Sequence, residues 1–340
     1  MDFGLFSMFS AREGSSQSQT FDEWFALVRL AEDAGLDTFW FGESHFRPHR
    51  AVMASPLIGA SAASSMTSRI GMGLAVQVLP LANPLRVAEE AAMVDHISQG
   101  RLLFGVGRSS FIESYHGYNV DYGESRSLFF ESLEVIQKAW SESPFSYHGE
   151  HYHFDDVDLV PKPLQTPHPP IRVAVESRET FSLIGSLGFP IFIRHQMDMP
   201  EIKELLANYK EQRELAGFTG PNDVILQMAA YVADTAENAR AIPEASTMRA
   251  RRLVRESLSN AADQEAYERL KRISEVTYDE VLTRVAYGTP EAVVERIQWY
   301  QEELGITGVS LDMNPGGQLP HQQVVDSIKL LADEVVPEFR

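Results

Sequence analysis

Short apolar segments alternate with longer amphipathic segments along the whole chain. A short, continuously apolar segment predicts a strand that is buried on both faces, as in a parallel sheet covered by helices. A longer segment with apolar residues three or four positions apart predicts a helix. Eight strands are expected by this criterion, at residues 2–9, 37–42, 69–80, 100–107, 170–175, 190–194, 224–233 and 308–313.

The segments between these strands carry the signals of helix ends. A helix over 21–35 is expected to stop at Gly35, and Asn83 and Pro84 are suited to cap and begin a helix over 84–98. Eight strand–helix units without a linker rich in Pro, Gly or Ser predict one α/β domain over 1–340, a (β/α)8 TIM barrel. The other helices are expected at 51–66, 125–141, 178–188, 200–216, from 290 onward and over 320–336.

Two regions depart from the alternation. Residues 143–169 are rich in Pro and His, and we interpret "HGEHYHF" (148–154) as a surface turn or small hairpin rather than a metal site. Residues 235–287 are charged and helical, with no clear strand, and form an insertion between the seventh and eighth strands. An insertion at that position is expected to cover the barrel mouth, where lids are common.

The charge balance excludes several classes of function. The 340-residue chain has 29 Lys and Arg against 48 Asp and Glu, a formal net charge of −19. Such a surface repels phosphate backbones and anionic lipid, so neither a nucleic acid nor a membrane is an expected partner.

The absence of cysteine excludes disulfides and thiolate metal sites. With no apparent signal peptide and no apolar run of ~18 residues, a cytoplasmic location is expected.

Polar residues follow the strands, where the active site of a barrel lies. Glu43, Ser44 and His45 follow the second strand, and "FGVGRSS" places a cation after a glycine-rich strand end. The segment "FGVGRSS" is a plausible phosphate cradle. The segment "VAVESRET" adds hydroxyls at a helix N-terminus, another possible anion site. Simple helix capping by Ser177 explains this second segment equally well. The spacing of Glu43, His45 and His49 matches no metal template, so no metal is expected.

Several segments, in the same order along nearly the whole chain, resemble bacterial luciferase and its flavin-dependent monooxygenase relatives. They include "GLDTFWFGESHF", "IRVAVESRET", "LGITGVSLDM" and, most specifically, residues 73–109; residues 235–287 are the least similar. The resemblance implies a barrel that binds FMN as FMNH2, supplied by a separate flavin reductase. It also implies that O2 reacts to give a C4a-peroxyflavin, which oxygenates a small organic substrate.

The resemblance assigns the cofactor-binding residues. Arg108, Glu176, Ser177 and Thr180 match the positions that hold the FMN phosphate in luciferase. An acidic residue beside a phosphate is unusual, so Glu176 is expected to act through its backbone N–H or by orienting Arg108. Ala75 and Val76 match the non-proline cis peptide beneath the flavin ring, and Gly107 stands where luciferase has a reactive cysteine.

Departures from luciferase concern the catalytic residues. Ser44 stands at the position of the catalytic histidine, the neighbouring histidine is retained as His45, and His195 replaces a tryptophan near the flavin. The expected catalytic group is therefore Glu43, Ser44, His45 and His195, with His45 or His195 transferring a proton. Light emission is not expected, whereas oxygenation of another substrate is.

Two alternatives stay open: an oxidoreductase of the same barrel type that uses the deazaflavin F420, and a flavin-binding protein without turnover. Helices 51–66 and 84–98 match the elements through which luciferase subunits pair, so a homodimer is expected. The substrate pocket is expected to be shaped by residues 111–124 and 235–287.

Overall fold

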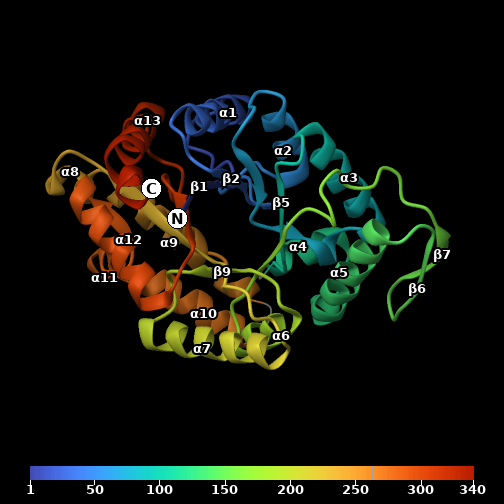
Figure 1. Ribbon diagram of the computed structural model, residues 1–340. Coiled ribbons are helices and arrows are strands. Elements are labelled where there is room, and N and C mark those ends of the chain that lie inside the picture. The colour runs from blue at the N-terminus through green and yellow to red at the C-terminus, as the bar shows by residue number, and fades with distance from the viewer. Residues whose placement is uncertain (110, 262–263) are drawn as a thin grey trace.

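The computed structural model describes residues 1–109, 111–261 and 264–340, and in it parallel strands close into a ring inside a layer of helices (Figure 1). The last strand pairs with the first, Phe3 lying opposite Val309, so the ring has no open edge. The predicted (β/α)8 barrel is confirmed. In order around the ring, the strands are β1 (Asp2–Ser7), β2 (Thr38–Phe41), β3 (Gly71–Leu74), β5 (Leu102–Gly107), β8 (Ile171–Ala174), β9 (Ile191–Arg194), β10 (Val224–Val232) and β12 (Gly308–Asp312).

The outer helices follow the predicted pattern with shifted ends. Asn83 caps its helix as expected, its Oδ1 accepting from the backbone N–H of Leu85 at 3.0 Å. The largest shifts at a helix start are at two helices: one begins earlier, capped by Ser16, and another begins only at Pro56. The helices are α1 (Gln17–Asp33), α2 (Pro56–Ser64), α3 (Pro84–Ile97), α4 (Ile112–Tyr118), α5 (Ser125–Ser141), α6 (Arg178–Leu187), α7 (Met199–Leu215), α12 (Pro290–Leu304) and α13 (His321–Leu330), with short turns η1 (Leu79–Leu81), η2 (Tyr122–Glu124), η4 (Leu331–Val335) and η5 (Val336–Phe339).

The late start of α2 has a local cause. The backbone N–H groups of Val52 and Met53 donate to the carbonyls of Phe9 and Met8 at 3.1 and 3.2 Å. Val52 and Met53 therefore satisfy these donors with the segment after β1 instead of continuing a helix. The expectation of a helix over the whole of 51–66 was wrong for its first turn.

The third predicted strand is divided in two. β3 ends at Leu74, the Ala75–Val76 peptide bond is cis as expected, and β4 (Gln77–Val78) resumes the pairing with β5. A Cβ on Gly105 of β5 would lie 1.7 Å from the carbonyl oxygen of Leu74. Only glycine allows the two backbones to approach this closely.

The barrel interior is filled below the mouth. Phe6, Trp40, Phe192 and Ile225 form one buried cluster, in which the Trp40 and Phe192 rings meet edge to face with centroids 4.8 Å apart. A larger core lies between the strands and the outer helices. Because side chains close the centre of the barrel, space for a ligand is left at the end where the strands finish.

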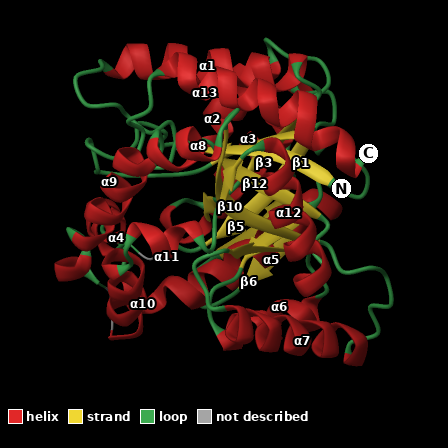
Figure 2. Ribbon diagram, turned by 90° about the vertical axis from the view of Figure 1, so that its left-hand side faces the viewer, coloured by secondary structure: helices red, strands yellow, loops and turns green. Residues whose placement is uncertain are grey.

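The insertion covers this end. In Figure 2, helices α4, α9 and α10 lie at the end of the barrel opposite the two termini. The expectation of no strand in 235–287 was wrong at its last residues, because Ala286 pairs with Ala230 of β10. This three-residue strand is too short to give a periodic signal. The elements are α8 (Ala236–Ala241), α9 (Glu244–Arg255), η3 (Leu258–Asn260), α10 (Gln264–Glu275), α11 (Tyr278–Leu282) and β11 (Ala286–Gly288).

The His-rich segment forms an antiparallel hairpin of β6 (Phe145–His148) and β7 (His153–Val157), which confirms that interpretation. Within the described ranges, no three His, Cys, Asp or Glu side chains are grouped so as to hold a metal ion. Among the described helices, none has both the length and the apolar character that crossing a membrane requires.

A charged cluster closes the other end of the barrel. Asp37 Oδ2 accepts from the backbone N–H of Phe3 at 2.8 Å, and Thr38 Oγ1 donates to Asp2 Oδ2 at 3.4 Å. The second oxygen of Asp2 is buried and has no hydrogen-bond partner among the residues described. Burial, reinforced by the nearby carboxylate of Asp37, raises the pKa of Asp2 to about 6.

Asp2→Asn is expected to raise the free energy of unfolding at pH 7 by about 1 kcal/mol. The folded-state pKa of Asp2 lies above the ordinary 3.8, so between about pH 4 and pH 6 the folded chain holds a proton that the unfolded chain releases. The contribution of Asp2 to stability therefore falls as pH rises through that window, and the substitution removes this fall. Urea unfolding at a series of pH values measures it.

The control is Asp37→Asn, which weakens the bond from Phe3 and the 2.9 Å ion pair with Arg340. It is expected to destabilise the protein at pH 7. Destabilisation of similar size by both substitutions would contradict the assignment of the raised pKa to Asp2.

Candidate active site

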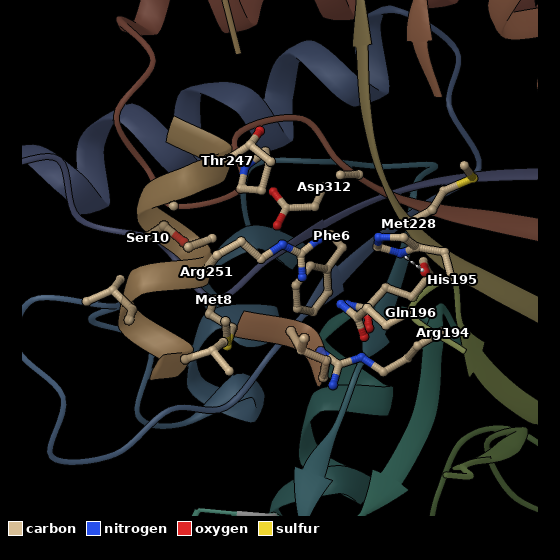
Figure 3. A pocket seen from close by; sticks show the side chains of 18 of the residues that line it. Phe6, Met8, Ser10, Arg194, His195, Gln196, Met228, Thr247, Arg251 and Asp312 are labelled. Atoms are coloured by element: carbon tan, nitrogen blue, oxygen red, sulfur yellow. Dashed lines mark hydrogen bonds between the residues drawn. The ribbon is translucent and has the colours of Figure 1, made fainter. Parts of the chain in front are cut away.

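Three adjoining cavities lie at the barrel mouth beneath α9 and α10. The central cavity, of about 140 Å³, is lined by residues such as Glu43, Ala75, Val76 and Phe192. The rim cavity, of about 200 Å³, contains Gly107, Arg108, Ser177 and Thr180. The inner cavity, of about 130 Å³, contains His195, Arg251 and Asp312 (Figure 3). The central cavity shares Arg108 and Glu176 with the rim cavity, and Phe6, Met8 and Arg50 with the inner cavity.

The rim cavity has the groups that bind a phosphate. Ser177 caps α6, its Oγ accepting from the N–H of Thr180 at 3.3 Å and lying 2.8 Å from the Thr180 hydroxyl. Arg108 follows β5 and donates to Ser125 Oγ at 3.3 Å. Within the described part of the chain Arg108 has no ion pair, so its charge is available to a ligand. A helix N-terminus with two hydroxyls and an arginine is a favourable anion site.

Glu176, expected to act through its backbone N–H or by orienting Arg108, has two ion pairs at the mouth of the barrel. Its carboxylate ion-pairs with Arg194 at 3.2 Å and with Arg269 at 3.4 Å. Two guanidinium groups compensate its charge, which removes the electrostatic objection to an acid beside an anion site. Because Arg269 lies on α10, the pair also connects the insertion to the end of β8.

Small residues form the floor between the central and rim cavities. Ala75 and Val76 line the central cavity, together with Ala174 at the end of β8. A Cβ on Gly107 would lie 2.8 Å from Val76 Cγ2, so a cysteine there would press on the residue that follows the cis bond. The predicted residues Ala75, Val76 and Gly107 are thus brought together.

Glu43 and His45 form a buried hydrogen-bonded unit. Glu43 Oε1 accepts from His45 Nε2 at 2.6 Å, and its Oε2 accepts from Gln77 Nε2 and the N–H of Val78, each at 2.9 Å. The Tyr118 hydroxyl lies 3.2 Å from His45 Nδ1. Burial raises the pKa of Glu43, although its bonds to His45 and Val78 oppose the rise.

This unit engages both ring nitrogens of His45 and both oxygens of Glu43. Glu43 belongs to the wall of the central cavity, whereas Ser44 and His45 do not. The backbone N–H of Ser44 donates to Met53 O at 2.9 Å, fixing the loop. In this arrangement Glu43 and His45 hold the loop after β2 against β4.

His195 lies in the inner cavity, away from the Glu43–His45 unit. Its Nδ1 donates to the carbonyl of Gln227 at 3.1 Å, which leaves Nε2 as the nitrogen with a free lone pair (Figure 3). Among the described residues Nε2 has no partner. Burial, followed by the charge of Arg251, lowers the pKa of His195 to about 3, so the ring is neutral at pH 7 and its Nε2 can accept a hydrogen bond.

Arginines that sequence analysis did not single out surround the cavities. The Arg47 and Arg50 guanidinium groups lie over the Phe111 ring, 4.0 and 4.8 Å from its centroid. Burial lowers the pKa of Arg50 to about 9 and raises that of Asp312 to about 6. Arg251 comes from α9, in the region that resembles the family least. The helical pattern of the sequence alone shows neither which face of the helix Arg251 occupies nor which residues surround it.

The chain was compared with known proteins. The profile of the family described as luciferase-like monooxygenase matches residues 1–308. One relative, the oxygenase component of the flavin-dependent trigonelline monooxygenase of Acinetobacter baylyi, is 27% identical over 71% of this chain and 67% of its own. The alkanal monooxygenase alpha chain of Photorhabdus luminescens is 24% identical over 99% of this chain and 96% of its own.

Solved structures share the fold at low identity. Monooxygenase RslO1 from Streptomyces bottropensis has a TM-score of 0.88 and 24% identity over 100% of both chains. The oxygenating constituent of 3,6-diketocamphane monooxygenase from Pseudomonas putida, in complex with FMN, has a TM-score of 0.83 and 19% identity over 99% of each chain. The F420-dependent tetrahydromethanopterin reductase from Methanopyrus kandleri has a TM-score of 0.75 and 18% identity, over 100% of this chain and 99% of its own.

Glu43→Gln is expected to lower the free energy of unfolding by about 2 kcal/mol. Three donors meet the carboxylate, so the amide group of glutamine must face one of them and leave it unpaired. Urea unfolding at pH 7 measures the loss. Glu90→Gln, at a partly exposed helical position that pairs with Arg86 at 4.0 Å, is the control and is expected to change stability by less than about 0.5 kcal/mol. Equal effects would contradict a structural role for Glu43.

Proposed function

The chain belongs to the luciferase-like monooxygenase family, and we propose that it is the oxygenase component of a two-component system that uses FMNH2. Its membership confirms the resemblance and the enzyme class, a flavin-dependent monooxygenase. The proposal adds the form of the flavin, its supply by a separate reductase, and the oxygenation of a small organic substrate. The observation that supports it most directly is the rim cavity.

The rim cavity fits the phosphate of FMN. Arg108 supplies a charge without an ion pair among the described residues, and Ser177 and Thr180 supply hydroxyls at the N-terminus of α6. The central cavity begins beside this group, over Ala75 and Val76. FMN would therefore extend from the rim cavity into the central cavity, with its ring system against these small residues.

Bound reduced flavin supplies the two electrons with which O2 gives one oxygen atom to the substrate and one to water. The residues of the chain would bind the flavin, shield it from water and orient the substrate. Helices α9 and α10 contribute Arg251, Leu270 and Ile273 to the cavity walls and so limit the access of water. Glu43 and His45 position the loop beside β4. Neutral His195 is suited to accept a hydrogen bond from substrate at Nε2.

The proposed system has two further partners, a flavin reductase that meets the oxygenase transiently and a second copy of this chain. The outer faces of α2 and α3 support a homodimer, because Ile58, Met93 and Ile97 are 71%, 50% and 44% exposed. Ser44 and Gly107, at positions of two functional luciferase groups, argue against light emission.

The activity is tested by mixing the protein with chemically reduced FMN, air and a panel of aldehydes, ketones and aromatics. The expected result is a product that gains one oxygen atom from 18O2, detected by mass spectrometry. Binding of FMN without any oxygenated product over a broad panel would favour a flavin-binding protein without turnover. A tight complex with F420 and no binding of FMN would overturn the proposal in favour of the deazaflavin alternative.

Arg108→Ala is expected to weaken FMN binding at least about 10-fold and to leave riboflavin binding nearly unchanged. Riboflavin lacks the phosphate that Arg108 would contact, so the ratio of the two affinities isolates that contact. Flavin fluorescence titration measures both dissociation constants. Lys138→Ala, which removes a cation from the other end of α5, is the control. Equal weakening of both flavins by Arg108→Ala would contradict the phosphate assignment.

A further inference from the structure

The inner cavity concentrates positive charge in a protein whose formal net charge is −19. Its wall includes Arg50, Arg194 and Arg251, and of the described residues in that wall Asp312 is the only acid. The charge of Arg194 is compensated by Glu176 at 3.2 Å. Arg50 and Arg251 have no ion pair within the described ranges. At least one cation of this cavity is therefore left without a counter-charge.

Arg251 is the cation that points to a ligand. Its side chain reaches from α9 into the cavity, on the side facing Phe6 and Asp312 (Figure 3). Its Nε is buried, and no described residue accepts a hydrogen bond from it. Burial lowers the pKa of this guanidinium, with Arg194 and Arg284 adding to the effect. A partly buried guanidinium whose Nε has no acceptor is unfavourable by itself and is stabilised by an anion, most effectively by a carboxylate held through two bonds.

His195 supplies the complementary group. The residue is 7% exposed, and its Nδ1–H is already used by the carbonyl of Gln227. Its Nε2 is a buried acceptor to which no described residue donates. Since the ring stays neutral at physiological pH, Nε2 remains an acceptor there. The same cavity thus has an unpaired donor on α9 and an unpaired acceptor after β9.

Apolar and neutral polar side chains complete the wall, and the cavity adjoins the proposed flavin site. Phe6, Met228 and Leu253 are among the apolar residues that line a space of about 130 Å³, which suits a small molecule. Phe6 also lines the central cavity, whereas Arg251 lines neither the central nor the rim cavity. A ligand held by Arg251 would therefore lie next to FMN without sharing that residue with it.

We propose that the inner cavity binds a small organic carboxylate that also carries a hydrogen-bond donor, with Arg251 binding the carboxylate and Nε2 of His195 accepting from the donor. That this ligand is the oxygenation substrate rests on the proposed function. Arg251 thereby determines specificity, and His195 orients the end of the molecule that carries the donor.

The test is isothermal titration of the full chain, with and without FMN, using matched probes. The probes are 3-hydroxybenzoate, 4-hydroxybenzoate and 6-hydroxyhexanoate, each compared with its neutral amide and with the acid that lacks the hydroxyl. The expected result is that at least one hydroxy acid binds 10-fold or more tightly than both of its partners. Equal or weaker binding of all three acids relative to their amides would overturn the inference.

Variants separate the two contacts. Arg251→Gln is expected to remove the preference for the acid over the amide, while Arg251→Lys keeps part of it. His195→Phe is expected to remove the preference for the hydroxylated acid. Arg252→Gln, at the exposed neighbouring position on α9, is the matched control and is expected to change neither of these two preferences. A preference for the acid that survives Arg251→Gln in folded protein would also overturn the inference.

Measuring FMN binding distinguishes failure of the carboxylate inference from failure of the proposed function. Arg251→Gln is expected to bind FMN as the unaltered protein does, since Arg251 lies outside the two cavities assigned to FMN. Intact FMN binding without any carboxylate preference would reject only the substrate class. Carboxylate binding that depends on Arg251 in a chain that binds no FMN would reject only the flavin assignment. Circular dichroism confirms that each variant is folded.

Discussion

The mouth of the barrel depends on one buried carboxylate. Glu43 accepts three hydrogen bonds, from His45, from Gln77 and from the N–H of Val78, and so joins the loop after β2 to the strand that follows the cis bond. Through His45 the connection continues to Tyr118 on α4. The floor formed by Ala75 and Val76 lies between these points, and its position is set by that carboxylate. Removing one of the donors leaves the others to hold the loop; removing the acceptor releases all of them.

The second organising feature is the distribution of charge. The surface is strongly acidic, yet arginines from separate elements converge on the mouth: Arg50 from the loop after β2, Arg108 after β5, Arg194 on β9, Arg251 on α9 and Arg269 on α10. Glu176 compensates two of them by a direct ion pair. Those without an ion pair among the described residues are Arg108, in the rim cavity, and Arg50 and Arg251, in the inner cavity. This distribution supports the proposed assignment of the rim cavity to a cofactor phosphate and of the inner cavity to a carboxylate.

The sequence predicts the barrel well, because the alternation of buried strands and amphipathic helices is a local property that closure does not alter. It also predicts which residues lie at the strand ends, including Glu43, Arg108 and His195. The sequence does not predict which side chains pair with one another in the folded chain. Glu176 is correctly placed beside the rim cavity, but its pairing with Arg194 and Arg269 depends on how α10 crosses the mouth. Arg251 could not be found at all, since its helix has several arginines and only the packed structure shows which one faces the cavity.

Helix α9 of the insertion is joined to the barrel by several hydrogen bonds. Ser246, 1% exposed, donates to the Pro315 carbonyl at 2.7 Å and accepts from the N–H of Gln318 at 2.8 Å. Arg249 donates to the carbonyl of His49 at 2.7 Å. A Cβ on Gly316 would lie 2.0 Å from the carbonyl oxygen of Ser246, so the helix packs directly on the loop after β12. These contacts hold the backbone of Arg251 in place, so a ligand has to order only the rotatable bonds of its side chain. A ligand that meets a partly preorganised cation loses less entropy on binding, which supports the proposed role of Arg251 in specificity.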